Sequence, residues 1–370
     1  MSATAKTWLD RIHELPLTRP VRVMNVCGGH ERTVSHSGLR SALPKNVEII
    51  PGPGCPVCIC PEEDIYDAIQ LSLNERLSLL AFGDMLRVPV NLPRREIRTL
   101  EQARAAGARV IPIATPVEAV HLARQSPAET FVFFAAGFET TMAPVAAMLA
   151  EHAPANLLLL LSGRLTRPAV SLLLDSDTPG FDALIAPGHV ATVMGAREWQ
   201  FVSQSHGIPT AVAGFRPDTL LAATYSVLRQ LVEGKAFLDN CYGEAVSEEG
   251  NRYAQRCLQR VMTVTDARWR GIGTIAQSGF ALSEAYRDSD VFAHFPRNQD
   301  TARRRIGQMP AGCDCARVVL GQIYPDQCRL YARACMPGQP AGPCMVSEEG
   351  ACRIWWANGV RANSPPVELH

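Results

Sequence analysis

The sequence lacks any apolar run long enough to cross a bilayer. Its longest continuous apolar stretches, at Phe131–Ala136 and Leu157–Leu161, are far shorter than the roughly 18 residues that a membrane helix needs. It also lacks, near its start, the basic residues followed by an apolar segment that mark a secretory leader. We therefore expect a soluble protein that stays in the reducing cytoplasm, where structural disulfides are rare.

Net charge is also missing. The 36 Lys and Arg residues balance the 36 Asp and Glu residues, and the pI is about 7.1. Proteins that bind DNA, RNA or an anionic membrane surface usually carry an excess of basic residues. We therefore expect neither nucleic acid nor a membrane as a partner. The 370 residues, 47% of them hydrophobic, are enough to fill more than one core.

Cysteines, by contrast, are plentiful and unevenly placed. Half of the 12 fall in the tail, which lacks the paired C-x2-4-C knuckles of zinc sites and offers mostly single thiols. Dispersed thiols suit a [4Fe–4S] cluster, which takes one thiolate per iron. Zinc binding and simple packing remain as alternatives. The predicted cluster ligands are the four most evenly dispersed cysteines, Cys328, Cys335, Cys344 and Cys352, with Cys313 and Cys315 as their replacements.

Short β-branched or apolar runs alternate along the chain with segments of helical character. This alternation predicts βαβ units and parallel sheets. We predict an α/β fold of two tandem parallel-sheet domains, residues 1–127 and 128–255, followed by a C-terminal iron–sulfur module, residues 256–370. The expected strands of the first domain are Val21–Val26, Val47–Ile50, Leu77–Phe82 and Arg109–Ile113, and those of the second are Thr130–Ala136, Asn156–Leu161, Ala183–Ala186 and Pro209–Ala213.

Reactive side chains follow several of these expected strands. In open α/β sheets, ligands bind beyond the carboxyl ends of the strands. The segment Cys27-Gly-Gly-His30 places a thiol and an imidazole on a flexible loop, which indicates a metal or nucleophile site. Cys55-Pro-Val-Cys58 has the spacing of thiol–disulfide exchange or metal binding. Glu139-Thr140 is a further catalytic candidate, although the same residues are common at a capped helix start.

Taken in order, these segments resemble the HypD family of hydrogenase maturation proteins. Any one motif is weak, but seven in order from about Val21 to Trp356 are specific. The segments are Cys27–His30, Gly52–Cys58, Phe82–Pro89, Gly137–Thr141, Pro187–Val190, Trp269–Gly273 and Cys344–Cys352.

The resemblance implies a role in building the Fe(CN)2CO group of [NiFe]-hydrogenases. It implies a HypC-type small chaperone as the partner that shares the iron, HypE as the source of cyanide, and a C-terminal [4Fe–4S] cluster. Cys27 matches the position that holds the iron carrying CN and CO, with His30 beside it. Cys55 and Cys58 match the paired thiols of a redox loop near the cluster.

Some residues depart from the family's usual pattern. Asn25 stands where Glu is common, Glu31 follows Gly-Gly-His where Thr is usual, Arg216 replaces a common Glu, and Cys60 adds a third thiol beyond Cys58. These departures leave the client hydrogenase open. Two other functions also stay open at this point: an iron–sulfur-dependent protein disulfide reductase, and a non-catalytic scaffold that only holds iron.

Overall fold

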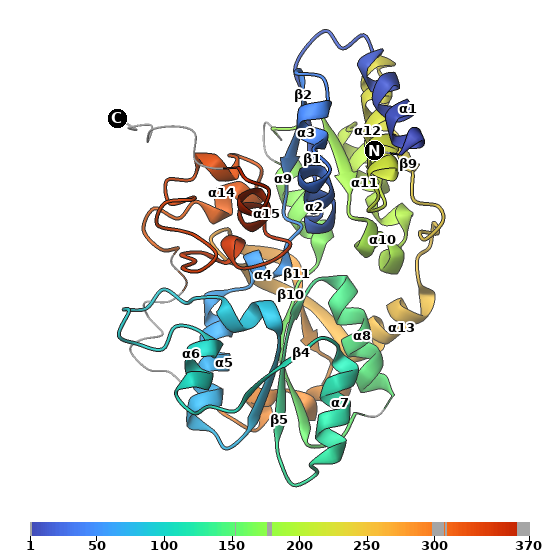
Figure 1. The fold of residues 1–370 in the computed structure, drawn as a ribbon. Helices are drawn as coiled ribbons and strands as arrows, with labels where there is room; N and C mark the ends of the chain where they lie inside the picture. Colours follow the sequence, from blue (N-terminus) through green and yellow to red (C-terminus); the bar gives the residue numbers. More distant parts are fainter. Residues whose placement is uncertain (1, 152, 176–179, 298–306, 308, 361–370) are drawn as a thin grey trace.

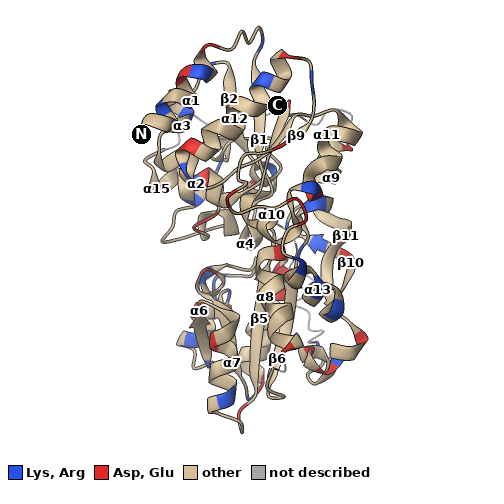
Figure 2. Ribbon diagram, turned by 90° about the vertical axis from the view of Figure 1, so that its right-hand side faces the viewer, with Lys and Arg blue, Asp and Glu red and all other residues tan. Residues whose placement is uncertain are grey.

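The computed structural model describes residues 2–151, 153–175, 180–297, 307 and 309–360. These residues form two α/β lobes, one above the other, with a cysteine-rich module beside their junction (Figure 1). Basic and acidic residues are distributed over both lobes (Figure 2). In the described part of the chain, no helix combines the length and apolar character needed to cross a membrane.

The upper lobe is built on a five-stranded parallel sheet in the order β2-β1-β7-β8-β9. One face packs against helices α1, α2, α3 and α12, and the other against α9, α10 and α11 with the 3-10 turn η2. The strands are β1 (Val21–Asn25), β2 (Val47–Pro51), β7 (Ala183–Ala186), β8 (Thr210–Val212) and β9 (Leu238–Asn240). The covering elements are α1 (Ala3–His13), α2 (Gly28–His36), α3 (Leu39–Ala42), α9 (Thr166–Leu174), α10 (Gly188–Met194), η2 (Ala196–Trp199), α11 (Gln200–His206) and α12 (Pro217–Val232).

The lower lobe is built on a four-stranded parallel sheet in the order β4-β3-β5-β6. Successive side chains of β5 alternate between the two faces, because a strand has a period of two: Val132 and Phe134 pack toward α5 and α6, Phe131 and Phe133 toward α7, α8 and α13. The elements are β3 (Ser78–Phe82), β4 (Val110–Ile113), β5 (Phe131–Gly137), β6 (Leu157–Gly163), α5 (Glu62–Asn74), α6 (Leu100–Ala105), α7 (Pro116–Gln125), α8 (Glu139–Ala150) and α13 (Arg252–Val261).

The α/β class and the two parallel sheets are confirmed, but the strands are not divided between the sheets as expected. The chain makes β1 and β2, crosses to build the whole lower sheet, and then returns to place β7 beside β1. The expected boundary between residues 127 and 128 therefore falls inside the lower sheet, between β4 and β5. Strand spacing predicts that strands exist, but which ones pair depends on non-local contacts.

An antiparallel hairpin that the sequence pattern did not predict links the lobes to the cysteine-rich module. It consists of β10 (Met262–Trp269) and β11 (Gly273–Leu282), and β11 lies against β6 and α9. The short turns η3 (Glu284–Ser289) and η4 (Val291–Ala293) follow. The module consists of α14 (Cys315–Val319), η6 (Pro325–Gln327), η7 (Pro343–Met345) and α15 (Ala351–Ala357) joined by loops.

The module contacts both lobes. Trp355 Nε1 of α15 donates a hydrogen bond to Glu31 Oε1 of α2, at 2.7 Å. The backbone N–H of Glu348 donates to Asp84 Oδ2 in the 3-10 turn η1 (Gly83–Arg87) of the lower lobe, at 3.1 Å. These two contacts hold the module over the carboxyl ends of β1 and β2, where the loops with Cys27 and Cys55 begin.

Candidate functional site

The Cys27 loop follows β1 and leads directly into α2. Cys27 has an extended backbone and is the N-cap residue of α2. The Gly28 N–H donates to the Gly54 carbonyl at 3.2 Å, so this loop lies against the loop that follows β2. A Cβ on Gly28 would lie 2.6 Å from the backbone oxygen of Glu349. Glycine at this position therefore lets the C-terminal module approach Cys27 closely.

Burial controls the protonation of Cys27. It raises the pKa of this thiol to about 12, and the Glu349 carboxylate adds to the rise. Hydrogen bonds from the backbone N–H groups of Gly29 and His30 act in the opposite direction but are outweighed. Free Cys27 is therefore a neutral thiol at physiological pH. A metal ion that binds this sulfur must displace its proton.

His30 lies in the first turn of α2 and is fully buried. Its Nδ1 contacts Asn25 Oδ1 at 3.1 Å, and its Nε2 contacts the Ala213 carbonyl at 3.0 Å. Burial lowers its pKa to about 4. Its ring packs on Phe215, with ring centroids 4.9 Å apart. Each ring nitrogen faces an oxygen, and the neutral ring donates its single N–H to one of the two. His30 thereby ties α2 to its neighbours from inside the fold.

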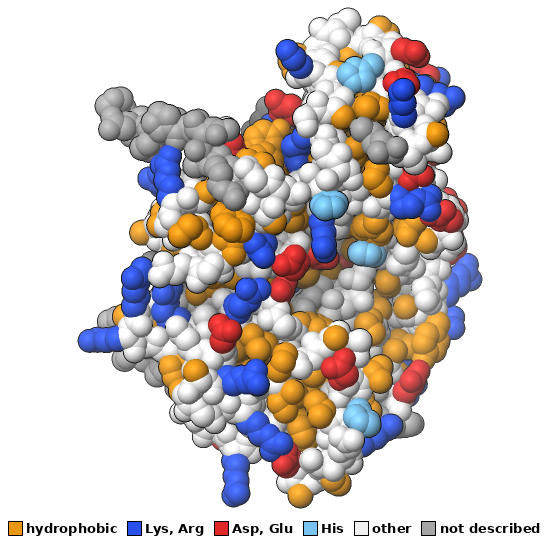
Figure 3. Space-filling view, in the orientation of Figure 1, with side chains coloured by type: hydrophobic (Ala, Val, Ile, Leu, Met, Phe, Trp, Pro, Cys, Tyr) orange, Lys and Arg blue, Asp and Glu red, His pale blue; other side chains and the backbone are white. Residues whose placement is uncertain are grey.

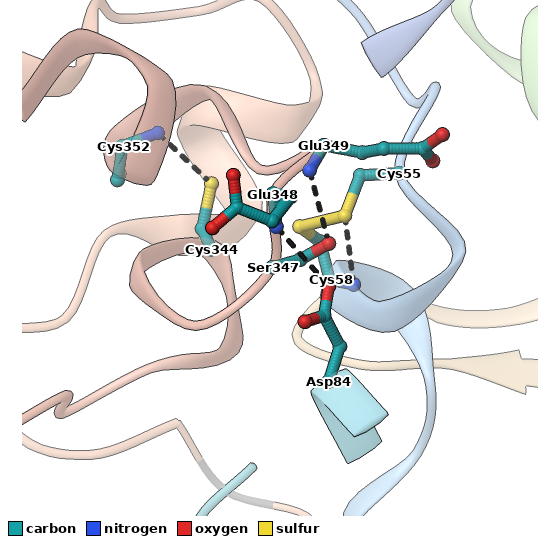
Figure 4. Close-up of a disulfide and its surroundings, with 8 residues drawn as sticks. All are labelled: Cys55, Cys58, Asp84, Cys344, Ser347, Glu348, Glu349 and Cys352. Carbon is teal, nitrogen blue, oxygen red and sulfur yellow. Dashed lines mark hydrogen bonds between the residues drawn. A yellow bond between two sulfur atoms is a disulfide. The ribbon is translucent and has the colours of Figure 1, made fainter. Parts of the chain in front are cut away.

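The second loop holds the cysteine pair. Cys55 precedes the one-turn helix α4 (Pro56–Ile59), and its sulfur accepts a hydrogen bond from the Cys58 N–H at 3.3 Å. The two residues form a disulfide, with Cα atoms 5.4 Å apart (Figure 4). Figure 4 also shows the Ser347–Glu349 segment of the C-terminal module lying beside this bond. The C-x-x-C spacing thus brings the two sulfurs within bonding reach, as predicted.

One small cavity joins these groups. It has a volume of about 20 Å³, room for a water-sized group, and lies where both loops meet the C-terminal module. Its sulfur-bearing lining residues are Cys27, Cys55, Cys58 and Cys344. The carboxyl-bearing ones are Glu31 and Glu349. The predicted iron position, the predicted redox pair and one predicted cluster ligand therefore border the same space.

The six C-terminal cysteines gather in the core of the module. The Cys313 and Cys315 sulfurs lie 3.4 Å apart, and a Cβ on Gly342 would lie within 2.7 Å of both. Cys344 interacts with Cys315 and Cys352, which lowers the pKa of Cys344 and raises that of Cys352. Cys328 and Cys335 flank this group, and burial raises the pKa of both. All four predicted ligands and both replacements are thus brought together.

These six thiols are the kind of donor that a [4Fe–4S] cluster needs, and they are two more than the four that it takes. Iron–sulfur clusters are held by cysteine thiolates, and glycine at position 342 lets the backbone approach two of the sulfurs where a Cβ would clash. Within the described ranges, no set of three or more His, Cys, Asp or Glu side chains is arranged to hold a metal ion as it stands. The fit therefore rests on soft donors and burial, and the choice of four among six stays a prediction.

Glu139 and Thr140 do not border the cavity. Glu139, at the start of α8, accepts hydrogen bonds from the N–H and the hydroxyl of Thr166, each at 2.7 Å, and so caps α9. Burial raises its pKa to about 7. Glu139 thus caps α9 and not its own helix, whose N-cap Phe138 makes no side-chain cap hydrogen bond. The predicted catalytic role of Glu139 and Thr140 stays a prediction.

Sequence reasoning missed three residues of the site. Glu349 borders the cavity, Asn25 contacts His30 and the Cys27 carbonyl, and Arg270 lies beside the redox loop. Glu349 and Arg270 each lie within a motif that carries the family resemblance. That position was the available sequence signal for a role at the site. Cys60 lies away from the cavity lining, with its sulfur 3.4 Å from Ser162 Oγ.

Comparison with known proteins assigns the chain to a family. A family model described as "HypD: Hydrogenase formation hypA family" matches residues 3–359. The hydrogenase maturation factor HypD of Escherichia coli is 37% identical over 347 residues, covering 91% of this chain and 89% of that protein. The hydrogenase expression/formation protein HupD of Azotobacter chroococcum is 36% identical over 377 residues (99% and 97%). The HypD of Rhodobacter capsulatus is 35% identical over 348 residues (92% and 90%). This chain therefore belongs to the HypD family of hydrogenase maturation factors.

Proposed function

We propose that this chain assembles the Fe(CN)2CO group of [NiFe]-hydrogenases in the cytoplasm, together with a HypC-type chaperone and HypE. The observation that carries the proposal is the shared cavity, because Cys27, the Cys55–Cys58 pair and Cys344 all border it. An iron carrying cyanide and carbon monoxide needs soft thiolate donors and a site closed to water. The sulfurs that border the cavity are buried, and Cys27 and Cys344 are free thiols that can supply such donors.

In this proposal, Cys27 anchors the iron that is being built, and a thiolate of the chaperone shares it. The Cys27 sulfur lies at the N-terminus of α2, where backbone N–H groups already donate to it and would stabilise its thiolate. His30 holds the loop in place through its contacts with Asn25 and Ala213. Its role is to position Cys27 for the iron.

The cysteine pair supplies thiol chemistry beside the iron. Reduction of the Cys55–Cys58 disulfide to two thiols consumes two electrons and two protons, and re-oxidation returns them. Cys328, Cys335, Cys344 and Cys352 are the proposed holders of a [4Fe–4S] cluster, which when bound provides one-electron transfer from an external reductant. Cys344 belongs to this set and also borders the cavity, so the proposed cluster site lies next to the disulfide.

Infrared spectroscopy of the protein co-purified anaerobically with its HypC-type chaperone tests the assembly role. We expect cyanide and carbonyl stretching bands from the wild-type complex and none from Cys27→Ser. His30→Ala should weaken the bands without abolishing them, because it removes a positioning contact and leaves the anchoring sulfur. Wild-type bands in Cys27→Ser would show that another residue holds the iron.

Iron and sulfide analysis of single Cys→Ser variants tests the cluster. We expect loss of the cluster in each of the four predicted ligand variants and its retention in Cys27→Ser. An intact cluster in one of the four variants would mean that the substituted residue is not a ligand. Cys315 would then be the first replacement ligand, because it interacts with both Cys344 and Cys352.

A second candidate function is protein disulfide reduction, and the preformed Cys55–Cys58 bond beside Cys344 favours it. In that case the cluster would reduce the pair, and the pair would reduce a thioredoxin-like protein without any chaperone. Reduction of such a protein by Cys27→Ser at the wild-type rate, with no infrared bands in the wild-type complex, would select this alternative. Activity of the complex in Cys55→Ser would instead indicate a scaffold that only holds iron.

A further inference from the structure

Arg270 is a fully enclosed cation between the redox loop and the cysteine cluster. It follows β10 directly, and only 2% of its side chain is exposed. Its backbone N–H donates to the carbonyl of Ile59, the residue after Cys58, at 2.9 Å. Its Nη2 donates to Glu62 Oε1 and, at 2.8 Å, to the Pro89 carbonyl. The backbone of Arg270 is thus held at Ile59, and its side chain is held through Nη2.

Two of its donor groups have no acceptor. Among the residues that the structure describes, Nε and Nη1 of Arg270 are buried and make no hydrogen bond. A buried guanidinium N–H without a partner is costly, because it has lost water and gained nothing in exchange. Glu62 already uses its second oxygen to accept from the Gly307 N–H, at 3.1 Å. The unused donors therefore require an acceptor that the described part of the chain does not supply.

The cysteine cluster lies within reach of this charge. Trp269, directly before Arg270, packs in one hydrophobic cluster with Cys315 and Cys344. Pro89, whose carbonyl accepts from the guanidinium, lines a groove together with Ala341, the neighbour of Gly342. Gly342 in turn lies against the Cys313 and Cys315 sulfurs. Cys313 itself contacts Cys315 at 3.4 Å, and Cys315 interacts with Cys344 and Cys352. The guanidinium thus acts on the group of thiols that fits an iron–sulfur cluster.

We propose that Arg270 is the positioning residue that sets the reduction potential of this cluster, by donating hydrogen bonds from Nε and Nη1 to its anionic sulfur. The inference rests on the proposed function insofar as that function includes a cluster. A cluster held by thiolates gains negative charge on reduction, and a nearby cation stabilises the more negative state. Arg270 raises the potential, and the Glu62 carboxylate limits that rise. Through Ile59, the same residue also fixes the disulfide loop beside the cluster.

Because Arg270 and Glu62 carry opposite charges, removing each charge should shift the midpoint potential of the cluster in opposite directions. The purified, anaerobically reconstituted full-length protein is titrated with dithionite while its electron paramagnetic resonance signal is followed. We expect the midpoint potential to fall in Arg270→Gln and to rise in Glu62→Gln. In Arg270→Lys it should fall less, because the charge stays but the forked donors are lost. A purely structural role of the ion pair would shift both single variants in the same direction.

The neighbouring pair Arg268 and Glu63 is the matched control. It also joins the hairpin to α5, at 2.7 Å, but the Arg268 side chain is 60% exposed. Arg268→Gln should leave the midpoint unchanged, because solvent screens an exposed charge. If Arg270→Gln does not fold because Glu62 is left unpaired, the double variant Arg270→Gln/Glu62→Gln replaces it, and its midpoint should lie below that of Glu62→Gln.

The outcomes separate this inference from the function on which it rests. Absence of iron and sulfide from the wild-type protein would overturn both. A cluster of normal content whose midpoint in Arg270→Gln and Glu62→Gln equals that of the Arg268→Gln control would overturn the role of Arg270 alone. Infrared bands from the chaperone complex would then still support assembly.

Discussion

At the scale of single residues, the chemistry of this site is decided by burial. Burial raises the pKa of Cys27 to about 12 and lowers that of His30 to about 4, so both groups are neutral at physiological pH. Neutral groups cost less to bury than ions. The charge needed for metal binding is therefore created only when an ion displaces the Cys27 proton.

The residues with unusual chemistry could be predicted from the sequence, and those that support them could not. Cys27 and the Cys55–Cys58 pair were found because thiols on glycine-rich loops after strands are informative in themselves. Glu349 and Arg270 are important because of where they lie. Carboxylates and guanidinium groups are common on any protein surface, so their residue types alone do not mark them as site residues. Only the folded chain places them beside the thiols.

Glu139 provides a prediction about pH. Its folded-state pKa of about 7 lies above the ordinary value of 4.5, so the folded protein binds a proton that the unfolded chain releases between these values. The free energy of unfolding should therefore fall as pH rises from 4.5 to 7, by up to about 3 kcal/mol. Glu139→Gln keeps groups that can pair with Thr166 and removes this ionisation.

We expect Glu139→Gln to be more stable than wild type at pH 8 and equal to it at pH 4, measured by denaturant unfolding. Maturation of a client hydrogenase should be retained, because Glu139 does not border the cavity. Loss of maturation in a variant with the expected gain in stability would instead support the catalytic role predicted from sequence.

At the scale of elements, loops beyond strand ends carry the site, and the glycines in them allow the elements to meet. The strands themselves follow from short apolar runs and were largely predicted. The assignment of the strands to the two sheets was not predicted, because β7 pairs with β1 although the entire lower sheet lies between them in the sequence. The β10–β11 hairpin was missed because its side chains are mostly exposed on β10 and give little apolar periodicity.

Gly28→Ala tests the contact between α2 and the C-terminal module. Alanine is the better helix former by about 0.5–1 kcal/mol, so without a clash the variant would be stabilised. The new Cβ would meet the Glu349 backbone oxygen at 2.6 Å, and overpacking of this kind costs about 1–3 kcal/mol. We expect a net loss in the free energy of unfolding. Gly83→Ala, where no heavy atom lies within 4 Å of the new Cβ, is the control and should not be destabilised.

At the scale of the whole molecule, the C-terminal module covers the site. The module lies against both lobes at their junction, over a face on which basic, acidic and apolar side chains are interspersed (Figure 3). The cavity is bordered by both the upper lobe and the module. In the proposed function, iron reaches Cys27 when these parts separate locally, and the strength of their contact should control access.

Trp355 is the contact at which this control can be measured. Its Nε1 donates to Glu31 Oε1 at 2.7 Å, and the Arg40 guanidinium lies over its ring, 4.8 Å from the centroid. Trp355→Phe keeps an aromatic ring and removes the hydrogen bond, while Glu31 keeps its 2.8 Å ion pair with Arg40. A hydrogen bond to a charged acceptor contributes about 1.5–3 kcal/mol, so opening should become about 10- to 100-fold more frequent.

The measurement is the alkylation rate of Cys27, followed by mass spectrometry of peptides under native, anaerobic conditions. Cys241 is the internal reference, because it lies after β9, away from the module, and its rate should not change. We expect Cys27 to react about 10- to 100-fold faster in Trp355→Phe than in wild type. Equal acceleration of Cys241 would indicate global unfolding. An unchanged Cys27 rate would mean that the contact between the module and α2 does not limit access to Cys27.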